Sequence, residues 1–237
     1  PSGTTKNALE GYDEVAARLQ LLFKPSDDLD ILLSGQLRQL DGTARVFRAN
    51  VFTRGQKGLN SNFNRYQVST DGKNEQHVNT YNGSARITYD AGPVSLVSVT
   101  SYWDGDATSV GDVDGGFGAS FLPPALTGPG YIPFTAETRD SVPKLSQFTQ
   151  ELRFESNGNE ALSYQGGFFY FDESLRILSE NYSTLGDPNN VPGGVNIVVT
   201  QRQNSKAYGV FGSVTYKLTD QFSVTGGLRY NNDRRRY

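Results

Sequence analysis

The chain has 237 residues, of which 36% are hydrophobic and 20% charged, with a formal net charge of −3 at pH 7. No run of 18 apolar residues occurs, which excludes a transmembrane helix, and the lack of a broad basic field argues against a nucleic-acid partner. The absence of cysteine excludes a disulfide framework, a Cys-ligated metal site and a Cys nucleophile.

The first predicted element is a hairpin. Residues 13–24 alternate apolar and polar side chains, residues 25–28 (Pro-Ser-Asp-Asp) have turn chemistry, and residues 29–39 alternate again. Pairing the two apolar faces predicts Leu21 opposite Leu33 and Ala17 opposite Leu37, and sets Lys24 opposite Asp30.

Three more hairpins follow, each with alternating arms around a turn. Residues 81–89 and 95–103 flank Ala91-Gly92-Pro93, and this register predicts Ile87 opposite Val97 and Tyr81 opposite Trp103. Residues 148–154 and 162–170 flank a turn at 157–159, and residues 208–216 and 222–230 flank one at 219–221. The turns recur about every 65 residues, which indicates an internal repeat.

Long stretches rich in Gly, Asn, Asp and Pro separate the hairpins, at about 41–79, 105–146 and 175–204. Short turns at one end and long loops at the other are typical of outer-membrane barrels, whose short turns are periplasmic. The strands, of about 11 to 13 residues, exceed the usual length in soluble proteins, and aromatic residues gather near their ends. The pattern therefore favours an all-β fold: an antiparallel up-and-down transmembrane β-barrel segment of about eight strands.

Four segments carry a resemblance to a known family. They are YDEVAARLQLLFKPSDDLDILLSGQ (12–36), VSLVSVTSYWD (94–104), FTQELRFES with LSYQGGFFYFDE (148–173), and KAYGVFGSVTYKLTDQFSVTGGLRYNND (206–233). Together they resemble the barrel strands of TonB-dependent receptors, the plugged outer-membrane barrels that import scarce nutrients.

The resemblance implies that residues 1–237 form a partial β-barrel domain, because such barrels have 22 strands and neither the plug domain nor the remaining strands are visible. The chain starts at Pro1 and has no Met, so we expect a piece of a longer protein. Isolated, it should form an open, curved sheet. The implied function is import of a ferric siderophore or other small organic ligand, with outer-membrane lipid as a partner and the TonB complex contacted only through the missing plug.

The parity opposite the apolar stripe carries charged and amide side chains that we expect to face a wet lumen, because lipid never contacts that face. These residues are Arg18, Gln20, Gln36, Arg38, Arg86, Glu151, Arg153 and Arg229. Ligand-contact candidates in the expected extracellular loops are His77, Trp103, Phe117 and Tyr131.

No catalytic, metal or cofactor site is expected. His77 is the only histidine, and Asp172 and Glu173, adjacent on a strand, should point to opposite faces. Asp104, Asp106, Asp112 and Asp114 would form an acidic loop whose spacing is not that of an EF-hand.

Two other interpretations remain open. Eight strands could close on themselves as an adhesin or anchor. Alternatively, the strands could form a soluble β-sandwich that binds carbohydrate, with platform residues Phe117, Phe121, Tyr131 and Phe134.

Overall fold

The computed structural model describes residues 9–48, 51–53, 56–61, 63–66, 68, 72–113, 124–125, 128–129, 137–157, 161–182 and 195–237. Eight long strands dominate: β1 (Tyr12–Ser26), β2 (Leu29–Gly42), β3 (Glu75–Asp90), β4 (Val94–Asp112), β7 (Glu137–Ser156), β8 (Leu162–Tyr182), β9 (Val195–Thr219) and β10 (Phe222–Arg236). Two short strands, β5 (Pro124–Ala125) and β6 (Gly128–Pro129), pair with each other. In this part of the chain no helix is long and apolar enough to span a membrane.

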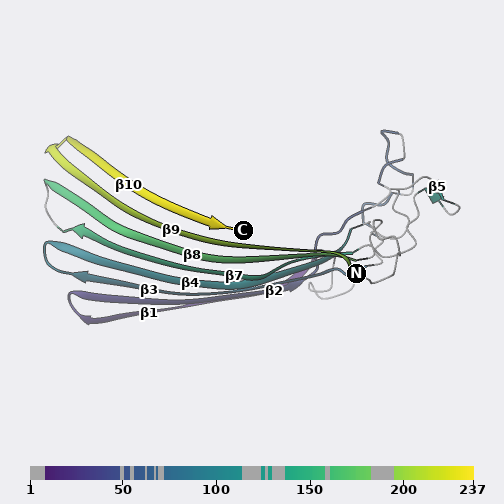
Figure 1. Ribbon diagram of the computed structural model, residues 1–237, viewed down its shortest axis with the longest axis horizontal. Helices are drawn as coiled ribbons and strands as arrows, with labels where there is room; N and C mark the ends of the chain where they lie inside the picture. The colour runs from purple at the N-terminus through teal and green to yellow at the C-terminus, as the bar shows by residue number, and fades with distance from the viewer. Residues whose placement is uncertain are drawn as a thin grey trace.

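The eight long strands form one antiparallel sheet in which each strand pairs with its neighbours in sequence, in the order β1-β2-β3-β4-β7-β8-β9-β10. Figure 1 shows this sheet as one curved layer, with the tight turns at its left end and with β1 and β10 at opposite edges. The up-and-down fold of four hairpins is therefore confirmed, as is the open, curved sheet. β1 and β10 do not pair, and among the described residues the second sheet has only the two short strands β5 and β6, so the self-closed barrel and the β-sandwich are both wrong.

The first hairpin has the predicted register. Leu21 pairs with Leu33 and Ala17 with Leu37, while Lys24 Nζ lies 3.0 Å from Asp30 Oδ2 beside the turn. The third and fourth hairpins also agree with the prediction. In each of them the alternating apolar residues of the two paired strands, β7 with β8 and β9 with β10, point to the same face.

The predicted register of the second hairpin is wrong by one residue. Ile87 pairs with Ser98 rather than Val97, and Tyr81 with Asp104 rather than Trp103. The turn sets this shift: Ala91 N donates to Val94 O at 2.9 Å, so four residues, not three, separate the paired Asp90 and Ser95. Gly92, with φ of 85°, takes the left-handed conformation that this turn requires. A one-residue shift moves every β4 side chain to the other face.

The strands also extend further from the tight turns than the sequence pattern predicted, so the connections between hairpins are shorter than expected. β3 begins at Glu75 and β4 ends at Asp112, while β7 begins at Glu137. His77, Trp103, Asp104, Asp106 and Asp112 therefore lie in strands and not in loops. The prediction failed because the ladder continues beyond the point where alternation of apolar and polar residues stops.

The registers assign every paired side chain to one of two faces. We call the face shared by Leu21, Leu33, Ile87, Leu152 and Val210 the apolar face, and the opposite one the polar face. Among the described residues only Ala44, Val97 and Val110 are buried hydrophobic side chains. A single layer without its own core needs covering on both faces by something else.

Candidate functional site

All eight residues expected to face a lumen lie on the polar face. Arg18 pairs with Gln36, Gln20 with Ser34, and Arg38 with Ala16. The row that starts at Leu32 then continues through Arg86, Val99 and Glu151 on successive strands. The polar face is therefore a continuous surface from β1 to β10, on which apolar and charged side chains are mixed.

The densest charge on the polar face is on β7. Arg153 Nη1 lies 2.8 Å from Glu151 Oε1, and Arg153 Nε lies 2.5 Å from Glu155 Oε1. All three side chains alternate along one strand and so point the same way. One guanidinium between two carboxylates leaves net negative charge on this part of the wall.

A cation-aromatic cluster occupies the polar face of the last three strands. The Arg229 guanidinium carbon lies 5.9 Å from the ring centroid of Phe169 and 5.6 Å from that of Phe211. Arg229 Nε donates to Asn231 Oδ1 at 2.8 Å, which fixes the guanidinium over the rings. The sequence showed Arg229 but not its ring partners, which three strands bring together.

Trp103, expected in an extracellular loop, lies in β4 on the polar face. It pairs with Asn82 and Gln147. A methyl group added at Gly105 would lie 3.0 Å from its Cη2, so the glycine leaves room for the indole. Trp103 is therefore partly exposed on the polar face.

His77 lies on the apolar face, where its Nδ1 is 2.5 Å from Asp41 Oδ1 on β2. The other two ligand candidates, Phe117 and Tyr131, lie outside the described residues, as does Asp114. Within the described ranges no three His, Asp or Glu side chains are grouped to hold a metal ion.

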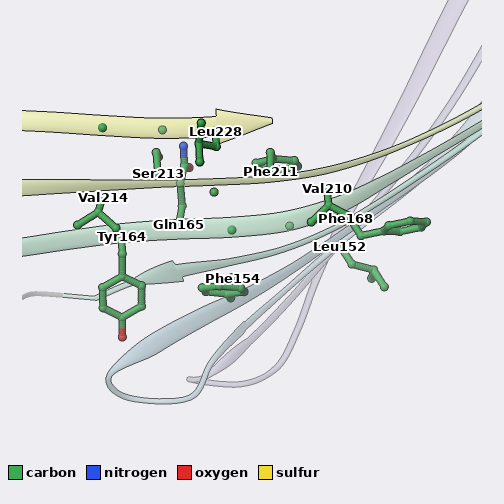
Figure 2. A pocket seen from close by; sticks show the side chains of 15 residues that line it. Leu152, Phe154, Tyr164, Gln165, Phe168, Val210, Phe211, Ser213, Val214 and Leu228 are labelled. Carbon is green, nitrogen blue, oxygen red and sulfur yellow. The ribbon is translucent and has the colours of Figure 1, made fainter. Parts of the chain in front are cut away.

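The apolar face is hollowed over β7 to β10, where a shallow groove of about 1220 Å³ is lined by Leu152, Phe154, Phe168, Val210 and Leu228 (Figure 2). Gly166 and Gly212, paired across β8 and β9, form its floor. The Phe154 ring leans over Gly166 and contacts Tyr164, with centroids 6.4 Å apart.

One polar cluster interrupts the apolar face. Gln150 Nε2 donates to Ser98 Oγ at 3.0 Å, and Thr100 Oγ1 donates to Gln150 Oε1 at 2.5 Å. The corrected β4 register puts these side chains there, and their mutual hydrogen bonds reduce the cost of facing apolar surroundings.

Beyond the aromatic residues, the apolar face becomes cationic on β7 to β10. We call this set the basic patch: Lys144, Arg176, Arg202, Lys206, Arg234 and Arg236. The sequence does not reveal the basic patch, because each strand contributes only one or two of its members. Following the same alternate positions beyond the predicted hairpins, into the ends of the strands, would have revealed the basic patch.

Further along the same strands, Arg139 is neutralised. Its Nη1 lies 3.5 Å from Glu180 Oε2, and its guanidinium lies 5.8 Å from the Tyr182 ring centroid. Burial raises the pKa of the Tyr182 phenol, which donates to Glu180 at 3.2 Å at the far end of β8. This closed network marks the outer limit of the basic patch.

Comparisons with known proteins agree with this geometry. A family model described as TonB dependent receptor-like, beta-barrel, matches residues 15–237. Among solved structures, the ferric yersiniabactin uptake receptor FyuA from Yersinia pestis is similar, with a TM-score of 0.68 and 13% sequence identity, over 96% of this chain. The chain spans only 30% of that receptor, and at this identity the likeness shows the fold alone. No curated protein matches. With nearly its whole length matched by the family model, the chain belongs to the TonB-dependent receptor β-barrel family.

Proposed function

We propose that this chain forms part of the barrel wall of an outer-membrane receptor that imports a scarce nutrient, such as a ferric siderophore or another small organic ligand. The observation that carries the proposal is the separation of side chains into two faces over eight strands in one continuous register. Members of the family are outer-membrane receptors and transporters rather than enzymes, and the proposal assigns no catalytic group.

The dimensions of the apolar face support a membrane-spanning wall. On β8 this face runs through Leu162, Tyr164, Gly166, Phe168 and Tyr170, and charge begins at Asp172. The ten residue-to-residue steps from Leu162 to Asp172 extend about 33 Å along the strand. With the strand tilt of about 40° usual in such barrels, this gives about 25 Å along the membrane normal, the height of their apolar band.

The polar face would then line the lumen. Arg153 with its two glutamates and Arg229 over Phe169 and Phe211 would give this lining one negative and one positive region. Such a surface suits contact with a plug domain or passage of a polar ligand, and charge is tolerated there because lipid does not reach it. The TonB complex would act through the plug, outside these residues.

The role of FyuA as a ferric yersiniabactin uptake receptor supports the class of ligand but not its identity. The proposal therefore covers chelated iron and other small organic nutrients, with the long-loop ends of the strands outside the cell.

The test is to express the full-length gene that contains this chain in a bacterium lacking its own siderophore receptors. We expect the protein in the outer-membrane fraction, and uptake of at least one labelled ferric siderophore or small nutrient from a panel. Uptake should stop when the host's tonB gene is deleted. Recovery of the protein in the soluble fraction, or uptake that persists without TonB, would contradict the proposal.

A further inference from the structure

The basic patch is built by the register of four strands. Lys144, Arg176 and Arg202 form one cross-strand row on β7, β8 and β9. Two rows nearer the tight turns, Asp172 pairs with Lys206, and Lys206 with Arg234. Arg236, paired with Asn204, lies in the row between. Since directly paired residues share a face, all six cations point away from the polar face.

The charge of the patch is almost uncompensated. Lys206 Nζ lies 2.9 Å from Asp172 Oδ2, but the other five cations make no ion pair with any described residue. Six cations and one carboxylate leave a charge of +5 on this face of β7 to β10, on a chain whose formal net charge is −3. Asp104 and Asp106 lie on the same face of the adjacent strand β4, at the border of the patch. Exposed like charges repel one another, so the patch calls for an external anion.

The patch has a defined position relative to the apolar band. Tyr170 and Tyr208 form the row next to Asp172 and Lys206, on the side of the tight turns. Phe148, paired with Asp172, and Tyr230, paired with Val210, lie in the two flanking rows. From Asp172 to Arg176 the strand advances about 13 Å, or about 10 Å along the normal at a 40° tilt. This matches the headgroup layer that borders the hydrocarbon core.

The opposite half of the sheet has no such charge. Beyond Tyr81 and Tyr102, the apolar face of β1 to β4 carries Asp41, Asp104 and Asp106. The cations are therefore a local feature of β7 to β10 and not a general property of strand ends in this chain.

We propose that the basic patch binds the phosphate groups of an anionic lipid headgroup in the outer leaflet of the membrane. This rests on the outer-membrane location in the proposed function. Arg176, Arg202 and Arg234 present forked donors that match phosphate oxygens, and Lys144 and Lys206 add point charges. Tyrosines at the band edge hold the same lipid at headgroup level. The neighbouring groove over Gly166 and Gly212 offers an apolar surface to its acyl chains.

The experiment uses the full-length receptor in detergent micelles, with three probes: bisphosphorylated lipid A, the same glycolipid without phosphate, and inorganic phosphate. The test variant is Arg176→Gln with Arg202→Gln. The matched control, Lys24→Gln with Lys217→Gln, removes two positive charges at the tight-turn end, where both lysines form exposed ion pairs. Bound lipid is counted by native mass spectrometry and by displacement of a fluorescent lipid.

We expect the test variant to bind bisphosphorylated lipid A roughly 10- to 30-fold more weakly than the unchanged receptor, at about three- to fivefold per cation. The control should stay within about twofold of the unchanged receptor. The phosphate-free glycolipid should bind the unchanged receptor and the test variant equally.

Three results would overturn the inference. Equal loss in the control would mean a general charge effect, and equal binding of both glycolipids would mean that phosphate is not recognised. Inorganic phosphate competing at the same concentration as the lipid would mean a free-anion site. The same variants are assayed for outer-membrane recovery and TonB-dependent uptake. If the test variant loses lipid binding but keeps outer-membrane recovery and TonB-dependent uptake, the lipid-binding role of the basic patch is supported. If the unchanged receptor is not recovered in the outer membrane, the proposed function itself is refuted.

Discussion

Replacing Gly166 with alanine should destabilise the sheet, whereas the same replacement at its cross-strand partner Gly212 should not. Both glycines lie on the apolar face and pair directly. An added methyl at Gly166 would lie 2.7 Å from Cζ and 2.9 Å from Cε1 of Phe154. At Gly212 the nearest atom would be the Gln165 carbonyl oxygen at 3.6 Å, an ordinary contact.

The magnitude follows from what must move. The Phe154 side chain is 44% exposed and can turn aside. An off-rotamer position costs about 0.5–1.5 kcal/mol, and loss of the Tyr164 contact about 0.5–1 kcal/mol more. Alanine is better than glycine inside a strand by about 0.5–1 kcal/mol. Only Gly166→Ala has the opposing cost, so it should be less stable than Gly212→Ala by about 1–2.5 kcal/mol.

Gly167 extends the series. A methyl there would lie 2.6 Å from the Leu152 backbone oxygen and 2.7 Å from Phe211 Cζ. The backbone oxygen is held by the strand ladder and cannot turn aside, so this variant should be the least stable of the three, by about 1–3 kcal/mol relative to the unchanged receptor.

The assay is urea unfolding of the full-length receptor in detergent micelles, with the folded fraction read from its heat-sensitive gel mobility. A Phe154→Leu substitution should restore stability to Gly166→Ala but leave Gly212→Ala unaffected, giving a coupling energy from the double-mutant cycle. Equal midpoints for Gly166→Ala and Gly212→Ala, or no coupling to Phe154, would refute this reasoning.

Two further predictions use the same unfolding assay. Arg153→Gln should lower stability by about 1–2 kcal/mol, because it leaves Glu151 and Glu155 on the same face without the cation between them. Lys24→Gln, which breaks an exposed pair, should change stability by less than about 0.5 kcal/mol. Equal effects would show that the Arg153 pairs are as dispensable as the exposed one. Gln150→Ala should lower the free energy of unfolding by about 1 kcal/mol, because Ser98 and Thr100 lose their hydrogen-bond partner on the apolar face. Adding Ser98→Ala and Thr100→Ala should recover most of that loss. If stability is not recovered, the hydrogen bonds contribute little.

Alternation of side chains was sufficient to predict most of the sheet. Where the two parities differ clearly in polarity, as in residues 13–24 and 208–216, the hairpin register follows directly. β4 failed because both of its parities contain apolar residues, with Val97 and Val99 on one and Leu96 and Tyr102 on the other. There the four-residue turn around Gly92 sets the register, and its length was not evident from composition.

The functional surfaces were harder to predict than the fold. The polar-face residues could be predicted because, within each hairpin, they occupy the alternate positions between the apolar residues. The basic patch combines residues from β7 to β10, and the Arg229 cluster combines residues from β8, β9 and β10, so neither exists until the strands are aligned. A pattern read along one strand contains no information about neighbours on the next.

The near absence of buried side chains bears on how this chain can diverge. A packed core restricts shape at many positions, but here only three hydrophobic side chains among the described residues are buried. Most positions need only the right polarity for their face, and the backbone ladder supplies the rest. Many different residues satisfy that demand, so a fold can persist while its sequence drifts, as the likeness to FyuA at 13% identity illustrates. Random substitution should therefore be tolerated at most apolar-face positions provided polarity is kept, with intolerance concentrated at the few crowded glycines.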